Sequence, residues 1–483
     1  MNLLPAAAVP TFGYLIASAL PVHLLQSRFT LLPLGDTIVA LATPPGVGAI
    51  AVIRLSGPEA FSITSALFKG KNLSEYPSHT VHYGALRDEG QLLDEVLVTL
   101  FRGPHSYTKE DVVEISCHGS EFIARRIIQS LLKGGARLAK PGEFTQRAFL
   151  NGRFDLAQAE AVADLIASDS EASHRTALHQ MRGGFSRQIK ALRDQLIHFA
   201  SLIELELDFG EEDVQFADRE DLRRLLRDLQ RVVGELVQSF NLGNAIKSGI
   251  PLVIAGRPNA GKSTLLNTLL REEKAIVSDI PGTTRDVIED ELVLEGVRFR
   301  LIDTAGLRHT TDAIEAIGVA RTREKMKGAS LLLYLFDASA TTPAELDAET
   351  AEVRELGIPI LLVGNKWDLV RNQSVWAGRT DITFIAAAQD WQVDALQGRI
   401  VRAVHADEWK KTDTMVTNLR HYESLRQTNL ALDQALSSLQ RGVSGDLLAL
   451  DIRAALHHMG EITGEITTED LLDNIFSKFC IGK

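Results

Sequence analysis

The chain has 483 residues, more than one hydrophobic core normally covers, so we expect several domains. Its 45% hydrophobic and 24% charged residues are ordinary for a soluble globular protein, and the net charge of −12 argues against a strongly basic nucleic-acid binder, although not against a local basic face. Only Cys117 and Cys480 are present, which excludes a disulfide framework and fits a reducing, cytoplasmic location.

Residues 1–35 are apolar and carry one charge, Arg28. They lack a basic n-region, and Pro5, Pro10 and Pro21 interrupt any spanning helix. A signal or membrane anchor and an organellar transit peptide are alternatives. We expect instead a disordered N-terminal extension and no stable membrane insertion.

Residues 36–151 predict a mixed α/β domain. The stretch DTIVALATPPGVGAIAVIRLSG has β-branched runs on both sides of Pro-Pro-Gly, which is typical of strand, loop and strand. LLDEVLVTLFRGPHSYTKEDVVEISCHGS repeats this style. SEFIARRIIQSLLKGG has the spacing of an amphipathic helix that ends at glycines.

Two helical blocks flank a second α/β region. Residues 152–248 and 405–483 keep apolar residues at helical spacing. No proline occurs between Pro141 and Pro251, so long helices are possible in the first block. Residues 249–404 alternate helical segments with continuous apolar runs such as PLVIAG and SLLLYLFDA, which suit parallel strands covered on both faces. We therefore predict one helical domain with a nucleotide domain inserted in it.

The inserted region begins with a phosphate-binding loop. GRPNAGKS at Gly256–Ser263 fits G-x-x-x-x-G-K-[ST] between a predicted strand and a predicted helix. Backbone N–H groups would hold the β-phosphate, Lys262 would bridge the β- and γ-phosphates, and the Ser263 hydroxyl would bind Mg²⁺. A glycine-rich turn without ligand is the plainer alternative, which this setting disfavours. The predicted GTP-binding residues of this loop are Asn259, Ala260, Gly261, Lys262, Ser263 and Thr264.

A second motif favours guanine over adenine. NKWD follows the apolar run IPILLVG, at the C-terminal end of a predicted strand, where ligands bind in open sheets. Asp368 can accept hydrogen bonds from N1–H and the 2-amino group of guanine. Alone the NKWD pattern could arise by chance. Because it follows a P-loop and the D-x-x-G motif DTAG at Asp303–Gly306, it predicts GTP binding. IAAAQ stands where many such domains have Ser-Ala-Lys, and the Ala387 backbone can still meet guanine O6. The predicted base-binding residues are Asn365, Lys366, Asp368, Ala386, Ala387 and Ala388.

Two segments between these motifs are predicted to contact the γ-phosphate. Thr284 in PGTTRD would reach Mg²⁺ and the γ-phosphate, and Asp303 in DTAG would bind Mg²⁺ through water. The Gly306 N–H would meet the γ-phosphate. Leu307 follows, where Ras-like enzymes carry the glutamine that orients the attacking water, and leucine cannot form that hydrogen bond.

Leu307 leaves several explanations open. The domain could bind GTP and hydrolyse it poorly, or another polar group could orient the water. Glu315 could act through a bridging water, although a solvated glutamate on a helix surface would give the same sequence pattern. A monovalent cation beside Asn259 could supply the charge that an arginine finger supplies elsewhere.

Together, these motifs resemble those of the MnmE (TrmE) family of tRNA-modification GTPases, within the TrmE-Era-EngA-YihA-Septin-like P-loop GTPases. The resemblance spans nearly all of residues 36–483 and includes TPPGVGAIAVIRLSG, SYTKEDVVEISCHG, KPGEFTQRAFLNGRFDLAQAEAVADLI, DIPGTTRD and the terminal FCIGK. It implies an N-terminal α/β folate-binding domain similar to aminomethyltransferases, an all-α helical domain, and a Ras-like doubly wound G domain inserted in that helical domain.

The resemblance also implies an activity and partners. The family forms a homodimer through its N-terminal domains and acts with the flavoprotein MnmG (GidA), which alone carries FAD, in a heterotetramer or larger complex. The complex adds an aminomethyl or carboxymethylaminomethyl group to C5 of the wobble uridine, U34, of certain tRNAs. The carbon comes from a tetrahydrofolate, 5-formyl- or 5,10-methylene-tetrahydrofolate.

For the G domain, the resemblance implies hydrolysis stimulated by K⁺-dependent pairing of two G domains. Glu315 aligns with the glutamate that orients water through a second water. The residues that would hold K⁺ are Asn259, Ser278, Ile280 and Thr283. The switch residues implied in GTP binding are Ser278, Asp279, Ile280, Pro281, Gly282, Thr283, Thr284, Asp303, Thr304, Ala305 and Gly306.

The implied folate site is spread over the sequence. Arg54 matches a folate-contacting arginine and could pair with the tail carboxylates, although alone it would be taken for a surface charge. Glu114 matches a carboxylate that faces the pterin ring. Arg153 stands where the family often has lysine, and Lys483 would reach the folate from the C-terminus. Cys480 could be a nucleophile, but a lone cysteine is more often a small apolar residue.

Two other functions stay open from the sequence. A pure molecular switch, such as a ribosome-assembly GTPase, would need only the G domain, and the N-terminal domain and FCIGK argue against it. A folate-dependent one-carbon enzyme could use GTP only for regulation. Loss of tRNA modification in Glu315→Ala with intact GTP affinity would argue against that second alternative.

Overall fold

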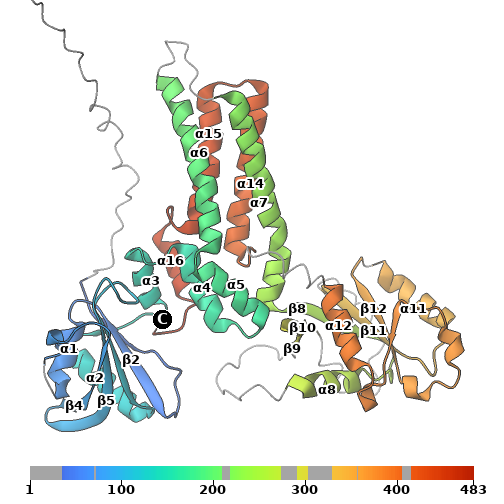
Figure 1. Ribbon diagram of the computed structural model, residues 1–483, viewed down its shortest axis with the longest axis horizontal. Helices are drawn as coiled ribbons and strands as arrows, with labels where there is room; N and C mark the ends of the chain where they lie inside the picture. The colour runs from blue at the N-terminus through green and yellow to red at the C-terminus, as the bar shows by residue number, and fades with distance from the viewer. Residues whose placement is uncertain are drawn as a thin grey trace, which may run out of the picture. The chain divides into compact units, whose positions relative to one another are not determined.

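The computed structural model describes residues 35–69, 72–208, 218–273, 291–302, 329–355, 357–404 and 415–482. The chain separates into two compact units. The first runs to Phe144 and includes the end of the chain from Ile481, and the second is Thr145–Cys480 (Figure 1). Within the described ranges, no helix is both long enough and apolar enough to cross a membrane.

The first unit is built on a seven-stranded sheet with the order β3-β4-β5-β6-β2-β1-β7. Neighbouring strands are antiparallel except for β1 and β7. The strands are β1 Ile38–Leu41, β2 Ile50–Ser56, β3 Phe68–Lys69, β4 Thr80–Asp88, β5 Gln91–Phe101, β6 Val112–His118 and β7 Arg137–Leu138. The helices are α1 Ala60–Leu67, α2 Glu121–Lys133 and α3 Glu143–Leu150, and α3 crosses into the second unit. The predicted strand-loop-strand and the predicted amphipathic helix are confirmed as β1–β2 and α2.

The two faces of this sheet have different surroundings. Ile53, Val98 and Ile115 point into a core that they share with Ile127 of α2. On the opposite face, alternate residues leave Ile50, Val81, Tyr83 and Leu97 exposed. Tyr83 lies directly opposite Leu97 in the β4–β5 pair. A sheet covered on one face is common for antiparallel strands, and here the other face carries several exposed large apolar side chains.

The helical part of the second unit combines residues from both sides of the inserted region. The helices are α4 Leu156–Ala167, α5 Glu171–Met181, α6 Gly184–Asp208, α7 Arg219–Ser248, α14 Leu419–Arg441, α15 Gly445–Thr463 and α16 Glu469–Phe476. Figure 1 shows α6, α7, α14 and α15 side by side. Their shared core contains Ile203 and Leu229 from the first block and Leu432 and Ile452 from the second. The predicted insertion into one helical domain is therefore confirmed.

The inserted domain is a six-stranded sheet with the order β13-β12-β11-β8-β10-β9, parallel except for the β9–β10 pair. The strands are β8 Ile250–Ala255, β9 Glu291–Leu294, β10 Val297–Leu301, β11 Leu331–Asp337, β12 Ile360–Asn365 and β13 Ile382–Phe384. The helices are α8 Lys262–Glu273, α11 Pro343–Arg354 and α12 Val393–Ala403. The runs PLVIAG, SLLLYLFDA and IPILLVG, predicted as strands, form β8, β11 and β12.

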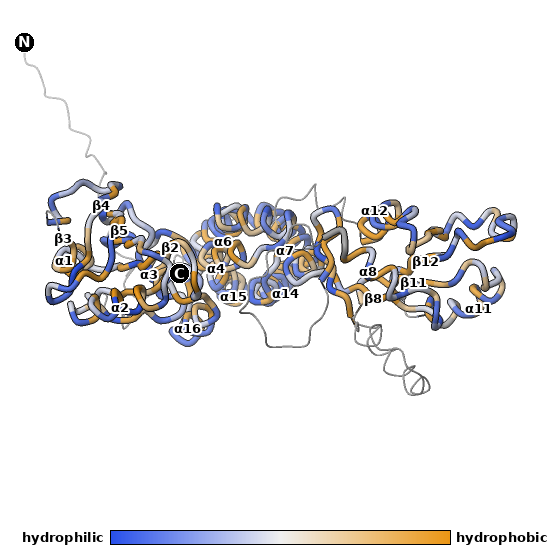
Figure 2. The backbone as a smooth tube through the Cα atoms, turned by 90° about the horizontal axis from the view of Figure 1, so that it is seen from below, coloured by the Kyte–Doolittle hydropathy of each residue, from blue (hydrophilic) through white to orange (hydrophobic). Residues whose placement is uncertain are grey.

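Helices on both faces explain why these strands are continuously apolar. Along β11, Leu331, Leu333 and Leu335 enter one core, whereas Leu332 and Tyr334 enter the core on the other face. Figure 2 shows much of β8 and β11 in the colours of hydrophobic residues. Hydrophobic and polar residues need not alternate along a strand when helices cover both faces of the sheet.

Candidate functional site

The P-loop lies between β8 and α8, at the C-terminal edge of the parallel strands. Gly256 has φ 145° and Gly261 has φ 97°, backbone conformations that favour glycine. A Cβ at Gly256 would collide with the Leu335 carbonyl, and one at Gly261 with the Asn365 amide. The loop is therefore packed closely against the sheet, which leaves its backbone able to surround a phosphate.

Lys262 crosses this loop. Its Nζ donates to the carbonyls of Gly256 at 2.7 Å and Arg257 at 2.9 Å. The ammonium group therefore lies over the loop, where the P-loop motif predicts the β- and γ-phosphates. Asn259 has φ 64° and its side chain is exposed, as are Ser263 and Thr264.

Asn365 joins the P-loop to the predicted base-binding segments. Its buried side chain donates from Nδ2 to the Ala260 carbonyl at 2.9 Å and accepts at Oδ1 from the Ala387 N–H at 3.0 Å. Asn365 thus holds the two loops at a fixed separation. Because this bond uses the Ala387 N–H, a guanine O6 at that position would have to share it; the predicted contact stays a prediction.

Lys366 and Asp368 follow on the same turn. Lys366 has φ 59°, and its Nζ pairs with Asp337 Oδ2 at 2.7 Å. Burial alone would raise the pKa of Asp337, but hydrogen bonds from Lys366 and Ser339 outweigh it and hold the pKa below its ordinary value. The exposed carboxylate of Asp368 accepts a hydrogen bond from Gln389 Nε2 at 3.1 Å, which restricts its orientation.

Three residues of this site were not predicted from the sequence. They are Asp337, Gln389 and Thr268, and Thr268 donates to the Ala387 carbonyl at 3.0 Å. Asp337 ends β11, so the acidic residue after the run SLLLYLF was the available signal. Nothing local marks Gln389 or Thr268, because each meets its partner only through the fold. Ala386 and Ala387 are buried and Ala388 is exposed.

Many predicted residues lie outside the described ranges. They are Ser278, Asp279, Ile280, Pro281, Gly282, Thr283, Thr284, Asp303, Thr304, Ala305, Gly306, Glu315 and Lys483. Their roles stay predictions.

The first unit brings Arg54 and Glu114 together. They face each other across β2 and β6, and Glu114 Oε1 accepts from Arg54 Nε at 2.8 Å and lies 2.7 Å from Nη2. Arg54 Nη1 also donates to the Gly482 carbonyl at 3.1 Å, and the guanidinium lies 5.5 Å from the Tyr107 ring centre. The predicted contacts of Arg54 with the tail carboxylates and of Glu114 with the pterin ring stay predictions.

The remaining candidates are placed separately. Arg153 belongs to the second unit, with its guanidinium 5.2 Å from the Phe154 ring centre. Cys480 is exposed, and Cys117 is buried. Burial, with the charge of Asp94, raises the pKa of the Cys117 thiol to about 11, so this thiol is not activated as a nucleophile.

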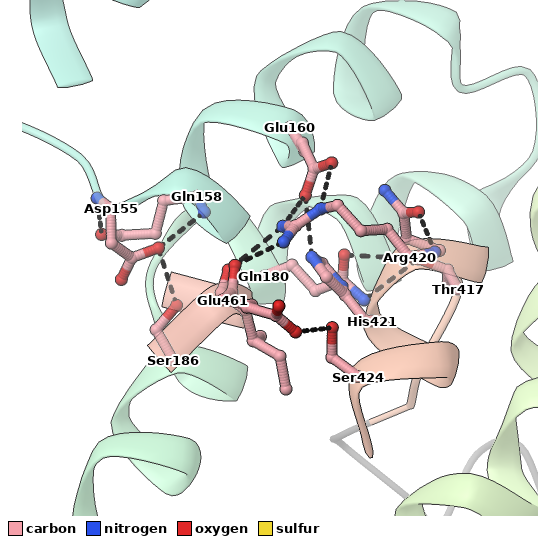
Figure 3. A network of polar contacts seen from close by, with 12 residues as sticks. Asp155, Gln158, Glu160, Gln180, Ser186, Thr417, Arg420, His421, Ser424 and Glu461 are labelled. Carbon is pink, nitrogen blue, oxygen red and sulfur yellow. Dashed lines mark hydrogen bonds and ion pairs between the residues drawn. The ribbon is translucent and has the colours of Figure 1, made fainter. Parts of the chain in front are cut away.

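A further polar cluster lies inside the helical domain, and we call it the Glu160 cluster: Glu160, Arg420, His421 and the Glu461 and Ile462 carbonyls (Figure 3). Arg420 donates to both oxygens of Glu160, at 3.1 and 2.7 Å, and to the carbonyls of Glu461 at 2.5 Å and Ile462 at 3.1 Å. His421 Nε2 lies 2.7 Å from Glu160 Oε2. This enclosed cluster links α4, α14 and the end of α15.

The charges of the Glu160 cluster follow from its surroundings. Burial alone would raise the pKa of Glu160, but His421 and Arg420 outweigh it and hold the pKa well below its ordinary value. Complete burial lowers the pKa of His421. Its Nδ1 is buried without a hydrogen-bond partner in the described structure, which fits a neutral ring with the proton on Nε2.

Comparisons with known proteins cover both units. A model of the GTP-binding protein TrmE N-terminus matches residues 37–153, and a model of the MnmE helical domain matches residues 156–480. Proteins called tRNA modification GTPase MnmE are 63% identical in Cytophaga hutchinsonii, over 93% of this chain and 98% of that protein, and 51% identical in Flavobacterium johnsoniae, over 93% and 99%. One from Bacteroides fragilis is 50% identical over 93% and 99%. This chain belongs to the MnmE family of tRNA modification GTPases.

Proposed function

We propose that the protein hydrolyses GTP to drive modification of the wobble uridine U34 in certain tRNAs, in the cytoplasm and together with the flavoprotein MnmG. The observation that carries the nucleotide half is the Asn365 side chain, which joins the P-loop to the loop of Ala387. One buried amide thereby sets the distance between the phosphate-binding and base-binding parts of the site.

The described residues fit a guanine nucleotide. When GTP binds, Lys262 would donate its hydrogen bonds to the β- and γ-phosphates in place of the Gly256 and Arg257 carbonyls, because carbonyl and phosphate oxygens both accept from an ammonium group. Asp368, held by Gln389, would accept from the two donors on the guanine edge. The exposed hydroxyl of Ser263, with Thr284, would bind Mg²⁺, which neutralises phosphate charge.

Hydrolysis then needs a group in place of the glutamine that Leu307 replaces. Glu315 would orient the attacking water through a second water. Asn259 would hold K⁺ together with Ser278, Ile280 and Thr283. Asn259 suits that role because the residue is exposed and not buried within the loop. K⁺ would supply the positive charge that an arginine finger supplies in other GTPases.

The first unit offers a place for a tetrahydrofolate. Arg54 brings guanidinium N–H donors beside the Glu114 carboxylate. Among the described residues, both of its contacts are with Oε1, so Oε2 could accept a hydrogen bond from a ligand N–H. Arg153 and Lys483 would add charge, and Cys480 stays a candidate nucleophile. The bound folate would supply the one-carbon unit for the uridine.

A second copy of the chain would cover the open face of the same sheet. Exposed apolar side chains on that face are Ile50, Val81, Tyr83 and Leu97. Arg54 lies on the same face of β2 as Ile50, because side chains along a strand point alternately to its two faces. A homodimer through this face would bury the apolar side chains beside the folate site. MnmG and the tRNA would then complete a heterotetramer or larger complex.

Base recognition gives a direct test with a matched control. Asp368→Asn should reverse one donor–acceptor pair, so the ratio of Kd values for GTP and xanthosine triphosphate should change on the order of 100-fold or more. Asp394→Asn, at an exposed carboxylate in the first turn of α12, should leave the ratio unchanged. An unchanged GTP preference in Asp368→Asn would remove this residue from the site.

A cation comparison tests the hydrolytic half. GTP turnover by the full chain should be faster in KCl than in NaCl at equal ionic strength, and Glu315→Ala should lose turnover while retaining GTP affinity. Equal rates in the two salts would contradict the K⁺ proposal. Full turnover by Glu315→Ala would contradict the role of that carboxylate.

A further inference from the structure

The β9–β10 hairpin of the inserted domain docks on the helical domain. Its two-residue turn, Glu295 at φ 48° and Gly296 at φ 79°, has the positive φ values of a type I′ turn. The Gly296 carbonyl accepts from the Ala172 N–H at 3.3 Å, at the start of α5. A Cβ on Gly296 would lie 3.3 Å from Glu171 Cβ, so glycine serves both the turn and the close approach.

Ion pairs reinforce this contact. Arg298 of β10 pairs with Asp169, in the connection before α5, and also donates to the Lys247 carbonyl at 2.7 Å, at the end of α7. Lys247 Nζ in turn pairs with Asp164 of α4 at 2.7 Å. One arginine of the nucleotide domain therefore contacts the ends of two helical-domain elements.

The other end of α5 reaches the point where the chain returns from the inserted domain. Gln180 Nε2 donates to the Met415 carbonyl at 2.9 Å and to Thr417 Oγ1 at 3.2 Å, and both acceptors just precede α14. A cavity of about 240 Å³ beside these contacts is lined by Asp164, Lys247, Arg298 and Thr417, among others. The joint thus combines ion pairs with a cavity that is incompletely filled, unlike a close-packed core that resists displacement.

We propose that α5, held between the β9–β10 hairpin and Thr417, passes the nucleotide state of the G domain to the helical domain. The inference rests on the proposed GTP binding. In the sequence, the hairpin directly connects the segment of Thr284 with that of Asp303, so groups expected to contact the γ-phosphate flank it on both sides. A shift of β10 would move Arg298 and, through Asp169, the start of α5. Two discrete arrangements of one packed element are what such coupling requires.

Amide hydrogen exchange of α5 tests this inference in the full-length protein. Exchange is measured with GDP and with a non-hydrolysable GTP analogue, each at saturation. Wild type should show about a fivefold or larger difference in α5 exchange between the two states, the lower end of usual coupling strengths. Asp169→Asn should reduce this difference while GTP binding is retained, because Arg298 loses its charged partner on the helical domain and, among the described residues, keeps only Glu291 of its own hairpin, and the P-loop and the Asn365 segment are untouched.

Controls separate coupling from folding. Arg453→Gln breaks an exposed pair with Glu204 on the helical bundle and should keep the wild-type difference. Asp169→Glu, which keeps a carboxylate opposite Arg298, should keep part of the wild-type difference. Equal α5 exchange in both states of wild type, or a full difference in Asp169→Asn, would overturn the inference while leaving GTP binding intact. Failure of wild type to bind GTP would instead refute the proposed function.

Discussion

Two arginine–carboxylate pairs in this protein look alike in chemistry and differ in surroundings. Arg420 bonds both oxygens of Glu160, whose side chain is 10% exposed, and it also donates from Nη1 and Nη2 to two carbonyls at the end of α15. Arg54, whose side chain is 14% exposed beside the Gly482 carbonyl, contacts only one oxygen of Glu114, whose side chain is 26% exposed. Among the described residues, both oxygens of Glu160 accept hydrogen bonds, whereas Oε2 of Glu114 keeps capacity for a ligand N–H.

This difference shows that residue type does not separate a structural pair from a binding pair. At the Glu160 pair, both carboxylate oxygens already accept hydrogen bonds from Arg420, and His421 Nε2 lies 2.7 Å from one of them. The pair on the sheet is stabilised only in part by its neighbours, as expected for groups that exchange partners when a ligand arrives. Mutations at the Glu160 pair should therefore mainly lower stability, whereas mutations at the Glu114 pair should mainly weaken ligand binding.

The largest expected effect is on stability at the Glu160 cluster. Glu160→Ala should lower the free energy of unfolding by about 3–5 kcal/mol, because it leaves Arg420 buried without a counter-charge. Urea unfolding of the full-length protein followed by circular dichroism measures this change. Glu204→Ala, which breaks an exposed pair with Arg453, should cost about 0–1 kcal/mol. Similar losses in the two variants would show that enclosure does not distinguish the pairs.

A smaller effect, on binding and not on stability, is expected at Arg54. Arg54→Ala should weaken binding of 5-formyl-tetrahydrofolate by about 10- to 150-fold, the range for losing a hydrogen bond to a charged group. Titration calorimetry measures it, with Arg87→Ala, at an exposed arginine of β4, as the control. If Arg54→Ala instead destabilised the fold by several kcal/mol with folate affinity unchanged, the sheet pair would be structural.

The smallest effect is the pH dependence of the Glu160 cluster. Burial lowers the pKa of His421 below its ordinary value of 6.5, so the unfolded chain binds this proton more readily than the folded protein. Stability from the neutral ring is present above about pH 6.5 and is lost as the pH falls below it, by up to about 1.4 kcal/mol per unit. Urea unfolding at pH 7.5 and 5.5 should show this loss, and His421→Gln should reduce it. An unchanged pH slope in that variant would show that His421 is not the titrating group.

The sequence specified the local chemistry of the nucleotide site. The glycines at Gly256 and Gly261 sit at positive φ as the P-loop pattern requires, and Lys262 lies over the loop. The continuous apolar runs became strands covered on both faces, and the absence of proline allowed α7 to run over Arg219–Ser248. These features depend on turn chemistry and periodicity within short windows, which a single sequence reveals.

Only the tertiary structure decided which distant residues meet. Glu160 and Arg420 are 260 positions apart, and Arg54 and Glu114 are 60 apart, so no local pattern announces either pair. The docking of the β9–β10 hairpin on α5 was likewise not predicted, and β9 was not among the predicted strands. Such contacts arise because strand order and helix packing bring remote faces together, and that packing depends on the whole set of buried side chains. The sequence thus predicted what each loop would bind, and the fold determined which carboxylates are more exposed and which are enclosed.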